Sequence, residues 1–158
     1  MARPVKIVDE EGFRFTVTGS GAGTTPQEAE GVSARPGYTF AFAEFMITNE
    51  QTDRTAPLHD LSRNWYVQVP RGAFGRDYGR HWSCGVAQSD YCGGRARCEK
   101  ARLGEFEVEP GVLRPAESQR YRCMLSEEVR MKLDPQDIRL VRWISSEERG
   151  TRVLIPLK

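Results

Sequence analysis

The chain has 158 residues, of which 39% are hydrophobic and 28% charged, and 23 basic against 22 acidic residues leave a net charge of +1. This length suits a single domain over residues 1–158 with a core of its own, and the balanced composition excludes a disordered chain. No apolar run approaches the roughly 18 residues of a membrane span. Near-neutrality argues against a nucleic acid partner, because nucleic acids are captured by excess positive charge.

Apolar residues alternate with polar ones along most of the chain, and this period of two indicates half-buried β-strands. In chain order, we expect strands at 3–8, 12–18, 38–49, 64–69, 105–110, 118–125, 138–144 and 151–157. At the start of 38–49 both faces are apolar, which predicts a central strand covered on both sides there. Seven or eight such strands predict two packed antiparallel sheets, an all-β sandwich.

Helical signals are few. The segment 126–135 has Ser126 as a candidate N-cap and Pro135 at its end, which predicts a short helical turn, although a strand is the alternative there. A second single turn is expected at 26–31. The Gly-rich segment 19–37 and the segment 71–102 are predicted to be loops.

Residues 71–102 are predicted to be a long insertion, with six glycines, three of the four cysteines and a local charge of +4. A loop of this length is usually functional or covalently organised. We expect disulfides among Cys84, Cys92, Cys98 and Cys123; of the three possible pairings we favour Cys84–Cys92 with Cys98–Cys123. The alternatives are a Zn²⁺ site made of His81, Cys84, Cys92 and Cys98, and four free thiols.

Catalytic motifs are absent from the sequence. It holds two histidines, His59 and His81, and no Gly-x-Ser-x-Gly elbow or cysteine-protease signature. We therefore expect no enzyme and no cofactor. The alternative is a cysteine-dependent enzyme in which Cys84, or less readily Ser89, is the nucleophile beside one of the histidines.

The 71–102 insertion has the composition of a protein-binding surface, because arginine and aromatic residues are enriched at interface hot spots. The candidate binding residues are Arg76, Tyr78, Arg80, Trp82, Tyr91, Arg95 and Arg97. The expected partner is another protein. In the alternative interpretation, Trp82 and Tyr91 pack back onto the sandwich and the arginines keep the loop soluble.

The strand pattern resembles a known family. The segments VKIVDEEGFRFTVTG, GYTFAFAEFMITNEQTDRTAPLHD and VLRPAESQRYRCMLSEEV, with a strand-end Asn49, are similar to the immunoglobulin-like domains of unknown function on actinobacterial lipoproteins and secreted proteins. A mycobacterial immunoprotective secreted antigen shares that fold. The resemblance implies an immunoglobulin-like sandwich outside the membrane and no established chemistry.

Together these features predict a non-enzymatic interaction module of a secreted or cell-surface assembly, binding through 71–102. The N-terminus shows no signal-peptide pattern, which leaves the cytoplasm as the alternative compartment. The alternative function is a structural or adaptor subunit of a larger particle, such as a phage virion or a toxin complex.

Overall fold

The computed structural model describes residues 2–9, 11–27, 31–57, 64–74, 91–102, 105–107, 112–144 and 151–158. These ranges form antiparallel strands, short turns, a 3₁₀ turn at 71–74 and a 3₁₀ helix, η3, at Pro135–Asp137, and they contain no α-helix. Within the described ranges, no helix has the length and apolar character needed to cross a membrane.

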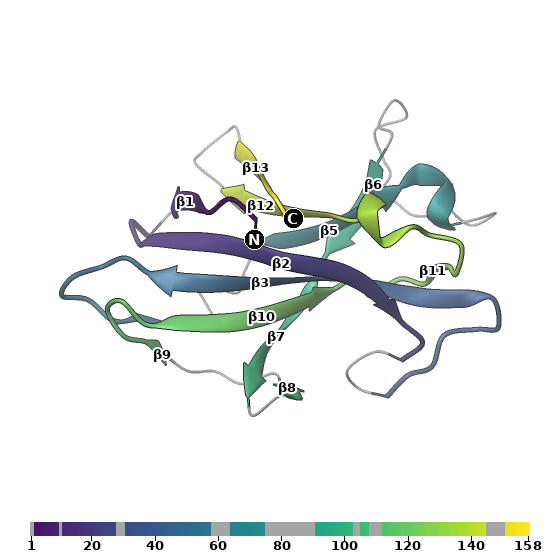
Figure 1. Ribbon diagram of the computed structural model, residues 1–158, viewed down its shortest axis with the longest axis horizontal. Coiled ribbons are helices and arrows are strands. Elements are labelled where there is room, and N and C mark those ends of the chain that lie inside the picture. The colour runs from purple at the N-terminus through teal and green to yellow at the C-terminus, as the bar shows by residue number, and fades with distance from the viewer. Residues whose placement is uncertain are drawn as a thin grey trace.

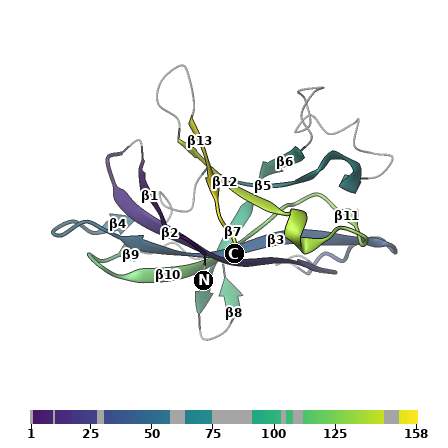
Figure 2. The ribbon, with the colours of Figure 1, turned by 45° about the horizontal axis from the view of Figure 1, so that its top comes forward.

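The strands form two main layers, which Figures 1 and 2 show from two directions. The first sheet has the order β1 (Val5–Val8), β2 (Arg14–Thr25), β3 (Tyr38–Asn49), β10 (Ser118–Met124), β7 (Arg97–Arg102) and β8 (Glu105–Glu107), with β11 (Val129–Arg130) also paired to β3. The second has the order β13 (Thr151–Ile155), β12 (Arg139–Ile144), β5 (Trp65–Pro70) and β6 (Tyr91–Arg95). A small third sheet pairs β4 (Ala56–Pro57) with β9 (Val112–Leu113).

The core lies between the two main layers, where one face of each sheet is apolar. Phe45 of β3 and Trp65 of β5 are fully buried, and their ring centroids lie 4.4 Å apart. Within the first sheet, Tyr121 of β10 lies directly opposite Phe45 and stacks on it, with ring centroids 5.9 Å apart. Because aromatic rings bury large apolar areas and favour tilted or offset contacts, this trio links both sheets. The predicted antiparallel β-sandwich is therefore confirmed.

The segment 71–102 is not a continuous loop, contrary to the prediction, because its last third forms two strands. Strand β6 pairs with β5 in the second sheet, and β7 pairs with β10 in the first. The change of sheet occurs at Ala96, whose amide donates a hydrogen bond to the Trp65 carbonyl at 2.9 Å. The prediction failed because glycines and charged residues interrupt the alternation of apolar and polar residues that marks a strand. These strands form because their backbone N–H and C=O groups make hydrogen bonds to β5 and β10.

Two further predictions are corrected. Strand β2 runs on to Thr25 through glycines that we assigned to the 19–37 loop, with a register shift between Gly19 and Gly21. The expected helical turn at 126–135 is wrong, since β11 occupies Val129–Arg130 and η3 begins at Pro135. The turn expected at 26–31 falls partly outside the described residues.

The remaining strand predictions agree with the structure, and the double-sided burial expected at the start of 38–49 is confirmed. Thr39, Phe40 and Ala41 are all buried, although successive side chains point to opposite faces of the sheet. Strand β8 covers the first half of the expected 105–110, and residues 108–110 lie outside the described part.

Asn49 closes the end of β3 with its side chain. It is 1% exposed, and its Nδ2 donates to the carbonyls of Arg54 and Leu113 at 3.0 and 2.9 Å. Its Oδ1 accepts from the Gln51 amide at 2.9 Å. A buried amide with its donors and acceptor satisfied fixes the turn after β3 and ties it to β9.

Gly19 offers a test of how the sandwich closes. A Cβ at this position would overlap the carbonyl oxygen of Pro156, so the segment after β13 packs directly on the β2 backbone. We expect Gly19→Ala to lower the free energy of unfolding by about 1–3 kcal/mol, the usual cost of overpacking. The measurement is urea unfolding followed by tryptophan fluorescence.

Gly72→Ala is the matched control, because a Cβ there meets no atom within 4 Å. It should change the free energy of unfolding by less than about 0.5 kcal/mol. Equal stability of the two variants would contradict the close packing of Pro156 on Gly19.

Candidate functional site

A disulfide joins the two sequence-distant strands β7 and β10. Cys98 and Cys123 lie directly opposite each other, with Cα atoms 4.0 Å apart, and form the predicted bond. Cys123 is completely buried. Cys92 on β6 is disulfide-bonded as well, whereas its predicted partner Cys84 lies outside the described residues. The described cysteines are therefore cross-linked, and none is a free thiol.

The Zn²⁺ alternative loses two of its four residues to these bonds, whereas the residues of the catalytic alternative lie outside the described part of the chain. A Zn²⁺ set that uses Cys92 and Cys98 as thiolates does not fit, because both sulfurs are in disulfides. Cys84, His81, His59 and Ser89 lie outside the described residues. Within the described ranges, no group of three or more His, Cys, Asp or Glu side chains is arranged to hold a metal ion.

The predicted binding residues are divided between the two sheets. Arg76, Tyr78, Arg80 and Trp82 lie outside the described part of the chain. Tyr91 and Arg95 belong to β6 in the second sheet, while Arg97 belongs to β7 in the first. The structure therefore brings Tyr91 and Arg95, but not Arg97, to the second sheet.

The outer face of the second sheet presents aromatic, aliphatic and arginine side chains. Trp65, Val67 and Val69 of β5 point inward and are fully buried, so alternate residues point outward. Cross-strand register extends this face to both neighbours of β5 and on to β13. We call it the arginine–aromatic face, and define it by Tyr66, Gln68, Tyr91, Arg139, Val141, Trp143, Arg152 and Leu154.

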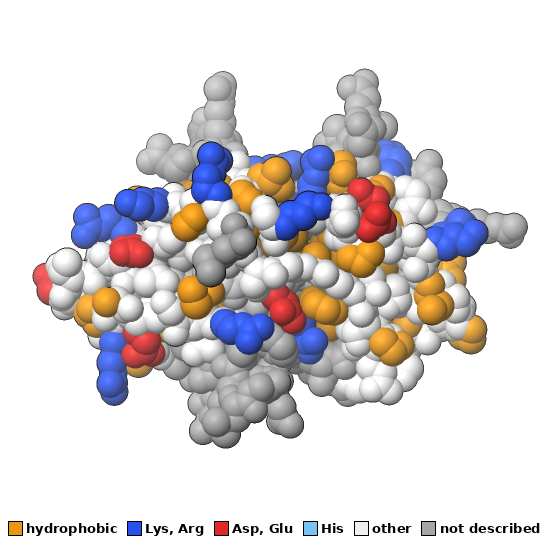
Figure 3. All heavy atoms as spheres, viewed as in Figure 1, with side chains coloured by type: hydrophobic (Ala, Val, Ile, Leu, Met, Phe, Trp, Pro, Cys, Tyr) orange, Lys and Arg blue, Asp and Glu red, His pale blue; other side chains and the backbone are white. Residues whose placement is uncertain are grey.

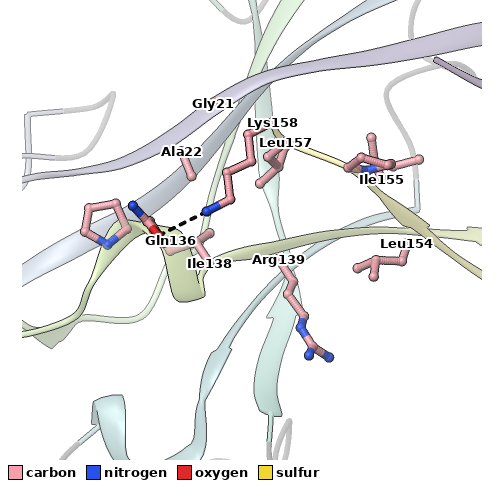
Figure 4. A pocket seen from close by; sticks show the side chains of 11 residues that line it. Gly21, Ala22, Gln136, Ile138, Arg139, Leu154, Ile155, Leu157 and Lys158 are labelled. Carbon is pink, nitrogen blue, oxygen red and sulfur yellow. Dashed lines mark hydrogen bonds between the residues drawn. The ribbon is translucent and has the colours of Figure 1, made fainter. Parts of the chain in front are cut away.

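Figure 4 shows Arg139 and Leu154 on the same side of β12 and β13, opposite Ile155. In the space-filling view of Figure 3, basic, hydrophobic and acidic side chains alternate along the upper part of the molecule, where Figure 1 has β1, β2, β12 and β13. The named residues of the face include two arginines and no acidic residue. The face is therefore locally positive although the chain as a whole is nearly neutral.

Two arginines of this face are held against aromatic rings. The guanidinium carbon of Arg139 lies 3.5 Å from the ring centroid of Tyr91, and that of Arg152 lies 5.1 Å from the ring of Trp143. Both arginines are exposed. Neither forms an ion pair or hydrogen bond within the described part of the chain. Stacking therefore orients two guanidinium groups and leaves their N–H donors unused.

Two arginines on the other side of the molecule, in the first sheet and its connecting loops, have acidic partners. Arg35 forms an ion pair with Glu128 at 2.6 Å, and Arg120 forms one with Glu44 at 3.6 Å. The N–H donors of Arg139 and Arg152, which have no acceptor among the described residues, can bind a carboxylate or another planar anion in a bidentate manner.

Sequence reasoning missed most of the arginine–aromatic face. It identified Tyr91 and Arg95 but looked for their neighbours within 71–102. Tyr66, Trp143 and Arg152 occupy outward positions of strands that the period-two pattern had already located. The outward positions of those strands could have identified these three residues from the sequence. That the three residues lie next to one another depends on sheet order, which the sequence pattern does not contain.

A cavity lies beside this face, at the edge of the sandwich between β2, η3 and the segment after β13. Its volume is about 390 Å³, within the range of small-ligand pockets. Most of its lining is apolar, and Lys158 Nζ donates to Gln136 Oε1 at 3.1 Å (Figure 4). Its described lining contains no carboxylate, imidazole or thiol, so these side chains offer binding contacts without an acid–base pair.

Tyr121 is the buried titratable group at the centre of the core. Desolvation by burial raises the pKa of its hydroxyl well above the ordinary value. The hydroxyl has no hydrogen-bond partner among the described residues. It lies between the sheets and away from the arginine–aromatic face, so we assign it to stability rather than to binding.

Comparisons with known proteins bear on the fold. No family model matches the chain, and no curated protein matches it significantly. The chain is similar in structure to an uncharacterized β-sandwich protein from Clostridium difficile 630, with a TM-score of 0.50 and 12% sequence identity over 98% of this chain and 90% of that one. At this identity the likeness supports the β-sandwich alone.

The Cys98–Cys123 disulfide can be tested by mass spectrometry. Trypsin cleaves after Arg97, Lys100, Arg122 and Arg130, so an unreduced digest should contain Cys-Glu-Lys joined to the peptide 123–130. Replacing both Cys98 and Cys123 by alanine should cost about 3 kcal/mol in the free energy of unfolding, because a bond over 25 residues restricts the unfolded chain. Recovery of peptide 123–130 as a free thiol would refute the bond.

The burial of Tyr121 predicts how the free energy of unfolding depends on pH. Because its folded pKa is raised, the unfolded chain releases this proton first as the pH rises above about 10, and unfolding becomes progressively easier. We expect Tyr121→Phe to reduce this alkaline loss and to raise neutral stability by up to about 1 kcal/mol, since an unpaired buried hydroxyl is removed. Urea unfolding between neutral and alkaline pH measures both effects.

Tyr66→Phe is the control, because Tyr66 is only half-buried and its substitution leaves Tyr121 intact. It should keep the wild-type alkaline loss. The assignment to Tyr121 fails if the two variants show the same dependence on pH.

Proposed function

We propose that this protein is a non-enzymatic interaction module of a secreted or cell-surface assembly, and that it binds another protein through the second sheet. The contact surface is the arginine–aromatic face, to which the 71–102 segment contributes strand β6. The proposal keeps the partner class expected from the sequence and moves the centre of binding from a loop to a sheet face.

One observation carries this proposal: two exposed arginines are stacked on aromatic rings and have no acidic partner among the described residues. A stacked guanidinium has little conformational freedom left to lose on binding, so its hydrogen bonds to a partner cost less entropy. Tyrosine, tryptophan and arginine are also the residues that dominate binding energy at protein interfaces. The face therefore has the chemistry of an interface centre.

Two observations support a location outside the cytoplasm. The described cysteines are in disulfides, which persist in oxidising compartments. The strand pattern also resembles the immunoglobulin-like domains of actinobacterial lipoproteins and secreted proteins. Both favour an extracellular or cell-surface assembly.

An affinity capture tests the proposal. The full chain is immobilised and exposed to the secreted and cell-surface fractions of the producing organism, and bound proteins are quantified by mass spectrometry. The variants are the double substitution Arg139→Gln with Arg152→Gln, and Arg14→Gln as an exposed control on the first sheet. A partner should be retained by wild type and control, and reduced at least about tenfold by the double variant, as expected for hot-spot arginines.

The same proteins on all three baits would contradict binding through this face, and no specific protein on any bait would contradict the proposed function. Light scattering separates the structural-subunit alternative, which predicts a symmetric oligomer of the purified chain. Alkylation of one hyper-reactive cysteine in the native protein would instead favour the cysteine-dependent enzyme.

A further inference from the structure

We infer that the partner contributes an extended segment in which two acidic side chains flank an apolar one, and that this segment lies across β12 and β13 between Arg139 and Arg152. This inference rests on the proposed function, because it specifies the partner chemistry of the same face. It follows from the order of side chains along the two strands and from their charge.

The two arginines stand at opposite ends of the face. Arg152 lies directly opposite Trp143, and Arg139 lies four residues before Trp143 on β12. At about 3.3 Å per residue, the two backbone positions are separated by roughly 13 Å along the strand direction. In an extended partner, side chains four residues apart point to the same side and have the same spacing, so one segment can reach both arginines.

The surface between the arginines is apolar. Leu154 is two residues after Arg152 on β13 and is 55% exposed, so much of its apolar surface contacts water. Val141 lies opposite Leu154 and Tyr66 in the register and is buried. The middle residue of an acid-x-apolar-x-acid segment would cover Leu154 and remove its surface from water.

This apolar middle distinguishes a peptide from a polyanion. A nucleic acid or a sulfated polysaccharide carries charge at every repeat and would place an anion over Leu154, where no described side chain of the face can neutralise it. A segment with carboxylates only at its two ends matches the face in both charge and polarity. The carboxylates accept paired hydrogen bonds from the guanidinium groups, which stacking on Tyr91 and Trp143 has already oriented.

Two capped peptides of identical composition test the inference. The first, Gly-Glu-Ser-Leu-Ser-Glu-Gly, has the proposed spacing; the second, Gly-Ser-Glu-Leu-Glu-Ser-Gly, brings the acids closer and turns leucine to the opposite side. Each is titrated into the full ¹⁵N-labelled protein and followed by amide chemical shifts. We expect the first peptide to bind at least about tenfold more tightly, with the largest shifts in β12 and β13, because charge-assisted hydrogen bonds each contribute about this factor.

Substitutions then assign the contacts. Arg139→Gln and Arg152→Gln should each weaken the first peptide about tenfold and reduce its preference over the second, and Leu154→Ser should weaken it severalfold. Arg14→Gln, on the other sheet, should leave its affinity within about twofold. All four positions are exposed, so the variants are expected to fold, and their amide spectra verify this.

Three outcomes overturn the inference: no saturable shift up to about 10 mM peptide, equal affinity for the two peptides, or equal loss with Arg14→Gln. A competition with short single-stranded DNA gives a fourth test. If the DNA displaces the first peptide and binds the Leu154→Ser variant as well as it binds wild type, the inference is wrong and the ligand is a polyanion. If affinity capture still retains a protein that depends on both arginines, the proposed function stands and only the partner's chemistry is wrong. If capture fails as well, both are wrong.

Discussion

The change of sheet at Ala96 is the constraint on which the rest of the structure depends. Before this residue the chain pairs with β5 in the second sheet, and after it the chain pairs with β10 in the first. The Ala96 amide is tied to the Trp65 carbonyl, and two residues later Cys98 is cross-linked to Cys123. One short segment is thereby fixed to both layers, which sets their relative position around the Trp65 and Phe45 rings.

The same constraint positions the arginine–aromatic face. Tyr91 precedes the crossover by five residues, so fixing Ala96 places Tyr91 at the outer face of β6, within reach of Arg139 from β12. Gly93 permits this arrangement, because a Cβ there would overlap the Val67 carbonyl oxygen. The position of Tyr91 thus depends on the close backbone approach of β6 to β5 at Gly93 and on the crossover that follows at Ala96.

Exposed arginines of this molecule have two kinds of neighbour, carboxylates and aromatic rings. On the first sheet and its loops, arginines such as Arg35 and Arg120 have carboxylate partners. On the second sheet, Arg139 and Arg152 contact aromatic rings instead. Exposed ion pairs add little to stability. The placement of arginines that have no carboxylate partner therefore matters more for recognition, because a nearly neutral chain can still attract an acidic partner to one face.

The sequence by itself determined the fold class and most strands, because period-two alternation records which side chains are buried and does so locally. It left three cysteine pairings open, and the structure supplies the Cys98–Cys123 bond. The sequence did not determine β6 and β7, whose glycines and charges give no periodic signal, or the end of β2, where glycines pair with β3. Only the tertiary structure decided that Tyr91, Arg139, Trp143 and Arg152 share one surface. These residues come from three strands, and which strands become neighbours is set by sheet order and register, which are long-range properties that no local pattern contains.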